Sequence, residues 1–171
     1  MPLLARLFSR QPDPREALRP LWHRTVELSR YPALYRDDGV ADTVAGRFDM
    51  IAAILALVML RLERDGRAAE TALLTELFVA DMDAQLRETG VGDVVVGKRI
   101  GKLVSVLGGR LGALREALAS KDPASLEAAL ERNVTMLEGR GTESLAARLR
   151  TFAGKLAALE ADEVLAGRIA L

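Results

Sequence analysis

The sequence has no cysteine and a single histidine, His23, and both shortages exclude kinds of chemistry. Without cysteine the chain forms no disulfide, carries no thiolate nucleophile and holds no metal through sulfur. One histidine excludes, within one chain, a metal site with two histidine ligands and the histidine–cysteine pair of a thiol enzyme. We expect no bound cofactor, no metal and no catalytic centre, while an enzyme with a carboxylate and base site stays open as an alternative.

Aromatic residues, surplus charge and long apolar runs are also scarce. Aromatic residues are only 4% of the chain. The 24 Lys and Arg balance the 24 Asp and Glu, and because the net charge is zero, no specific nucleic acid is expected as a partner. The longest uncharged apolar run, residues 50–60, is well short of the roughly 20 residues that span a bilayer. Residues 1–10 lack the apolar stretch of a signal peptide, and we expect a cytoplasmic protein.

Good helix formers make up much of what is present. Half of the 171 residues are hydrophobic, which suits one all-α domain at residues 13–171, preceded by a flexible segment at residues 1–12. The helix expected at residues 43–63, with Asp42 as its N-cap, is apolar on nearly every side, which is typical of a buried central helix. About six helices are predicted, near residues 14–30 (kinked or divided at Pro20), 43–63, 68–88, 94–120, 123–138 and 143–159.

Asp81 interrupts the apolar face of the helix expected at residues 68–88. A carboxylate among apolar side chains needs a partner, so we expect Asp81 to be shielded and paired with a base of the next helix. Asp83 points to another side and faces Arg87 one turn later, which predicts an exposed ion pair. Because the two carboxylates diverge, they are not expected to hold a divalent metal together.

The helix expected at residues 94–120 carries an apolar, a basic and a small-residue stripe. Each interior glycine costs about 1 kcal/mol relative to alanine, so a close helix neighbour should offset that cost. We favour a neighbour inside the fold; a helix of another protein is the alternative. The small stripe consists of Gly97, Gly101, Ser105, Gly108 and Gly112. The basic stripe, expected to be solvated, consists of Lys98, Arg99, Lys102 and Arg110.

Three segments resemble a known family. They are Leu34-Tyr35, Phe48-Asp49-Met50-Ile51 and residues 78–98, which read FVADMDAQLRETGVGDVVVGK. Together they resemble the ubiquinol–cytochrome c chaperone family over about residues 34–118. The resemblance implies a helical assembly chaperone for the cytochrome bc complex, with cytochrome b or an assembly intermediate as client and without a catalytic step. It also implies proximity to the ribosome or the inner face of the membrane, and a second assembly subunit.

The candidate client-binding residues lie in the third segment and on the basic stripe after it. They are Asp81, Asp83, Arg87, Asp93, Lys98, Arg99 and Lys102. Two positions depart from the family pattern, which often has a histidine where this chain has Ile54 and an aromatic residue where it has Gly108. Roles tied to those side chains are therefore not carried over.

Two alternatives stay open at this point. Leucines and Phe8 with Arg6 and Arg10 make residues 1–10 amphipathic, which would suit a membrane-surface binding protein. A small enzyme is the other alternative, with a carboxylate and base site made by Asp81 and Lys98 or Arg99. A concave pocket with converging polar groups would favour that enzyme.

Overall fold

Helices form the regular structure throughout residues 13–88 and 96–171, the part of the chain that the computed structural model describes, without the side chains of residues 86, 88 and 96–99. The all-α prediction is confirmed, and six of the described helices have ten residues or more. In chain order the elements are the 3-10 helix η1 (Pro14–Leu18), α1 (Arg19–Ser29), α2 (Pro32–Arg36), α3 (Val44–Arg64), α4 (Ala68–Glu88), α5 (Val96–Ala119), α6 (Ala124–Asn133), α7 (Glu143–Ala158) and α8 (Ala161–Leu165).

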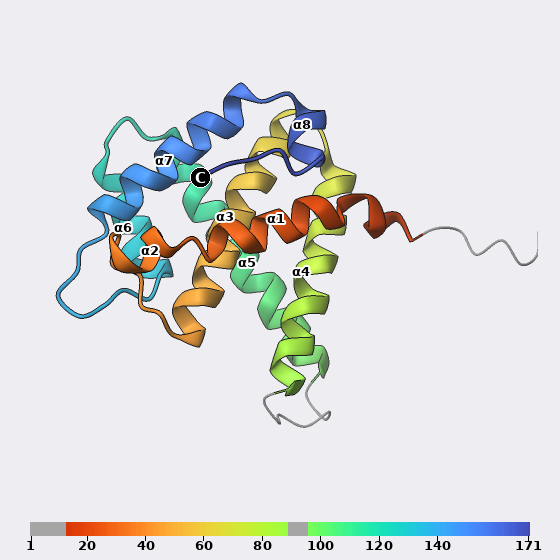
Figure 1. The fold of residues 1–171 in the computed structure, drawn as a ribbon, viewed down its shortest axis with the longest axis horizontal. Helices are drawn as coiled ribbons and strands as arrows, with labels where there is room; N and C mark the ends of the chain where they lie inside the picture. The colour runs from red at the N-terminus through yellow and green to blue at the C-terminus, as the bar shows by residue number, and fades with distance from the viewer. Residues whose placement is uncertain (1–12, 89–95) are drawn as a thin grey trace, which may run out of the picture.

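Helix α3 is the centre of the fold, as predicted from its apolar residues (Figure 1). Every residue from Met50 to Met59 is buried. A helix that is apolar on all sides has to be covered on all sides, and α1, α4, α5 and α7 pack around it. The other helices are thus arranged about α3 as an axis. None of the described helices is both long and apolar enough to cross a membrane.

Helix starts differ in detail from the predicted ones. Pro20 lies in the first turn of α1 and divides the predicted first helix into η1 and α1. The N-cap of α3 is Thr43, whose hydroxyl accepts a hydrogen bond from the Gly46 amide at 3.1 Å, so the prediction of Asp42 as N-cap is wrong. Asp42 pairs instead with Arg47 at 2.6 Å. A Cβ on Gly46 would lie 2.0 Å from the carbonyl oxygen of Ala41, so only glycine fits there.

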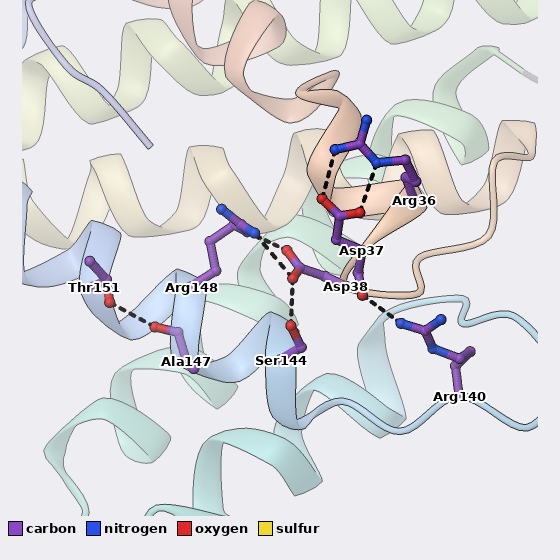
Figure 2. A network of polar contacts seen from close by, with 8 residues as sticks. All are labelled: Arg36, Asp37, Asp38, Arg140, Ser144, Ala147, Arg148 and Thr151. Carbon is purple, nitrogen blue, oxygen red and sulfur yellow. Dashed lines mark hydrogen bonds and ion pairs between the residues drawn. The ribbon is translucent and has the colours of Figure 1, made fainter.

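The loop between α2 and α3 is fastened to α7 by a buried carboxylate (Figure 2). The side chain of Asp38 is 1% exposed and accepts hydrogen bonds from the Ser144 hydroxyl at 2.6 Å and from the Arg148 guanidinium. The hydrogen bond to Asp38 raises the pKa of Arg148. Arg140 donates to the carbonyl oxygen of Asp37 beside it. This network closes the fold on the side away from α4.

Candidate functional site

Asp81 lies on the surface of α4 and accepts a hydrogen bond at 2.6 Å from the indole Nε1 of Trp22 on α1. Trp22 is 1% exposed, and its ring meets the Phe78 ring edge-on, with the centroids 6.2 Å apart. The prediction that Asp81 is shielded and paired with a base is therefore wrong. A buried tryptophan needs an acceptor for its N–H group, and Asp81 supplies one from the rim of the α1–α4 contact.

Asp83 forms the predicted ion pair with Arg87, with 2.8 Å between Oδ2 and Nε. Its side chain is only 14% exposed, however, and no described residue donates a hydrogen bond to its buried Oδ1. The exposure of the two aspartates is thus the reverse of the prediction. Helical spacing gives the direction of a side chain, but it does not show which neighbouring helix covers it.

The small-residue stripe of α5 has no neighbour inside the described part of the fold. A Cβ added to Gly101, Gly108 or Gly112 would meet no atom within 4 Å, and Ser105 is exposed. The prediction of an internal neighbour is therefore wrong for these residues, while Gly97 lies outside the described side chains. The buried leucines of α5 lie on the side of the helix that faces the core. The stripe is on the other side of the helix and is therefore open.

Two apolar side chains extend this surface. Ile100 is 38% exposed and Val104 is 45% exposed, although both are large hydrophobic residues. Together with the small residues they form a surface that we call the open face of α5. It consists of Ile100, Gly101, Val104, Ser105, Gly108 and Gly112. Such a face lets the backbone of another helix approach closely.

Three of the candidate client-binding residues that the structure describes, Asp83, Arg87 and Lys102, lie toward the end of α4 and near the start of α5. These two ends lie together at the foot of Figure 1. Arg87 and Lys102 are exposed there, and Asp83 is partly covered. Asp81 is exposed at a different place, at the rim of the α1–α4 contact. The turn residue Asp93 and the side chains of Lys98 and Arg99 lie outside the described residues.

A buried ion pair between Asp49 and Arg110 sets the orientation of α5 against α3. The carboxylate also accepts hydrogen bonds from the amide and hydroxyl of Thr135, at 2.9 and 2.7 Å. Arg110 donates to the carbonyl oxygen of Asn133 at 2.9 Å and lies over the ring of Phe48, 5.3 Å from its centroid. Burial lowers the pKa of Arg110, and the charge of Asp49 opposes that shift.

Sequence reasoning missed this ion pair. Arg110 was placed on a solvated basic stripe, and that placement is wrong because its side chain is only 10% exposed. One signal was present: Asp49 is an aspartate within a helix predicted to be buried on every side, so it needed a cation. The ion pair joins the Phe48-Asp49-Met50-Ile51 segment of α3 to α5.

The surroundings of Asp81 bear on the enzyme alternative. Asp81 lines an open pocket of about 530 Å³ together with His23 and Glu27 of α1 and with Arg30, the residue after that helix. The residues that share this pocket lie in α1, at the start of α2 and between them, and none of the described side chains of α5 is among them. The side chains of Lys98 and Arg99 lie outside the described residues. No group of three or more acidic or histidine side chains that could hold a metal ion occurs among the described residues.

Comparisons with known proteins extend the resemblance found in the sequence. A family model described as ubiquinol-cytochrome C chaperone matches residues 36–171, well beyond the segment ending near Leu118. Among solved structures, the crystal structure of the Cbp3 homolog from Brucella abortus is similar, with 30% sequence identity and a TM-score of 0.80. The match covers 98% of this chain and 95% of that chain. No curated protein matches.

Proposed function

The chain belongs to the ubiquinol–cytochrome c chaperone family, and we propose that it binds cytochrome b, or an early intermediate containing it, during assembly of the respiratory cytochrome bc complex. The family match over residues 36–171 carries this proposal. A chaperone for such a client holds apolar surface that would otherwise aggregate before assembly. Holding of this kind requires an exposed surface that fits a helix.

The open face of α5 is the surface that we assign to the client. Where glycine takes the place of a larger residue, the axis of a second helix can come close, and many weak dispersion contacts then form along both backbones. Covering the exposed parts of Ile100 and Val104 adds roughly 1 kcal/mol each. Because no described element occupies the face, a client helix can bind there without first displacing any of the described helices.

Charged residues at the ends of α4 and α5 would form the polar rim of the client site. Arg87 and Lys102 are exposed at this rim, and a charged rim favours one orientation of a bound helix over others. Asp81 would contact the client from the α1 side of α4. Asp83 would act through its ion pair with Arg87. Asp93, Lys98 and Arg99 belong to the same segment of the chain and complete the proposed set.

The proposed client determines where the protein would act. Cytochrome b is a membrane protein, so the chaperone would work in the cytoplasm at the inner face of the membrane, near ribosomes that release the new chain. A second assembly subunit is part of this proposal.

The test is deletion of the gene. We expect lower cytochrome b haem absorbance and lower activity of the cytochrome bc complex, with the other respiratory complexes mostly intact. Reintroducing the wild-type gene should restore both. Normal cytochrome b haem in the deletion strain would contradict the proposal.

A further inference from the structure

A pocket of about 570 Å³ lies between the C-terminal parts of α3 and α5 and one side of α7. Its floor is apolar and includes Leu57, Leu118 and Leu156. Four arginines and a single glutamate also line it: Arg61, Arg64, Arg115, Arg150 and Glu63. The pocket thus combines an apolar floor with a strong excess of positive charge.

Two of the four arginines have partners within the fold. Arg61 pairs with Asp65 and donates to the carbonyl oxygen of Leu156 at 2.9 Å, near the end of α7. Arg115 pairs with Glu63 at 2.6 Å. Packing and local ion pairs therefore account for the positions of these two side chains.

The other two arginines, Arg64 and Arg150, have no hydrogen bond or ion pair with any described residue. Arg64 lies in the last turn of α3, where a cation is favoured by the helix dipole. Arg150 lies in the middle of α7, so no such dipole effect explains it. Its Nη2 is buried and lacks an acceptor, which is an unfavourable state for a guanidinium.

The charges around this pocket do not cancel. The carboxylates of Glu63 and Asp65 offset two of the four guanidinium groups, and the charges of Arg64 and Arg150 remain over an apolar floor. A ligand that brings a carboxylate and an apolar group together would satisfy both features. Carboxylates are natural partners of guanidinium groups because two parallel hydrogen bonds can form.

We propose that this pocket binds an acidic, apolar peptide segment of a partner protein, whose carboxylates pair with Arg64 and Arg150 while a leucine-sized side chain covers the floor. A single acidic side chain can enter the pocket and pair with the part of the half-buried Arg150 guanidinium that lines it. A flat bilayer surface would meet only the rim, so a peptide fits better than an anionic membrane. This inference concerns a separate surface and does not rest on the proposed function.

The test is a fluorescence anisotropy titration with a labelled 12-residue peptide of leucine and glutamate, and a second peptide with glutamine in place of glutamate. We expect the glutamate peptide to bind wild-type protein at least tenfold more tightly, with a preference that weakens as salt rises. The double variant Arg64→Gln, Arg150→Gln should bind the glutamate peptide at least tenfold more weakly. Arg132→Gln is the control, because Arg132 is exposed on α6 outside the pocket.

A second variant leaves all four arginines in place. Ala119 is exposed at the rim, and Ala119→Glu would supply a competing carboxylate, so it should also weaken binding. Circular dichroism melts of each variant verify folding. Equal affinity for the two peptides, no peptide binding, or equal weakening by Arg132→Gln would overturn the inference. Sedimentation with phosphatidylglycerol vesicles that depends on Arg64 and Arg150, without peptide binding, would assign the pocket to a lipid surface instead.

Discussion

The carboxylate of Asp49 on α3 and the guanidinium of Arg110 on α5 form an ion pair in which each side chain is only 10% exposed. Arg110 points from α5 toward the core, so the opposite side of that helix points outward. The outward side carries the open face, with Gly101, Gly108 and Gly112. The buried ion pair and the buried leucines on the same side of α5 thus leave the opposite surface open to another molecule.

Removal of the carboxylate from this pair should destabilise the fold strongly. Asp49→Ala strands the Arg110 guanidinium in the interior and removes two hydrogen bonds to Thr135. We expect the free energy of unfolding to fall by about 3–5 kcal/mol, measured in urea melts. The double variant Asp49→Leu, Arg110→Met should lose less than Asp49→Ala alone, because no charge is left unpaired. A loss below about 1 kcal/mol for Asp49→Ala would contradict a buried pair.

Asp81 should affect stability moderately and should also change the fluorescence of Trp22, the single tryptophan in the chain. Asp81→Ala leaves the indole N–H without its acceptor, so we expect a loss of about 1–2 kcal/mol and a shift of the emission maximum. Asp81→Asn keeps an acceptor oxygen and should cause less than half that loss. If the emission of Asp81→Ala matches that of the wild type, the hydrogen bond does not form in solution.

If the open face of α5 binds the client, a substitution there should weaken client binding without lowering the stability of the fold. Gly101→Leu adds a side chain where no described atom lies within 4 Å of the new Cβ, so stability should hold or rise by up to about 1 kcal/mol. Capture of the client in a pull-down from membranes should fall, because the added side chain keeps a second helix away. Thermal melts and quantitative mass spectrometry measure the two effects.

Gly154→Leu is the matched control for that substitution. Gly154 is an exposed helical glycine on α7 with equally open surroundings, and it lies outside the open face. It should gain similar stability and keep normal client capture. A Gly101→Leu protein that unfolds more easily than wild type, or that still captures the client, would show that the open face does not have the proposed role.

Asp38 should be needed to hold the loop before α3 against α7. Asp38→Ala removes the acceptor for Ser144 and for Arg148, and we expect a loss of about 2–4 kcal/mol in urea melts. Asp38→Asn keeps the acceptor for Ser144 and should lose less. Ser144→Ala removes only one neutral hydrogen bond, so its loss should be about 1 kcal/mol. Equal losses for Asp38→Ala and Ser144→Ala would show that Arg148 contributes nothing.

Local signals predicted the helical framework correctly. The 3.6-residue spacing of apolar side chains located α3, α4, α5 and α7 to within a few residues of their observed ends. The same spacing identified α3 as the central helix, since a helix that is apolar on all sides has to be covered on all sides. The residue motifs also indicated the family, because they are read directly from the order of the side chains.

Tertiary packing decided instead which side chains are exposed and which are buried. This applies to Asp81, Asp83, Arg110 and the glycines of α5. Helical spacing gives the angle between side chains of one helix, but it holds no information on which neighbour covers a given angle. The indole of Trp22 reaches Asp81 from 59 positions away in the chain, and Asp49 and Arg110 are 61 positions apart. Burial is set by such distant contacts, which exist only once the helices have assembled around α3.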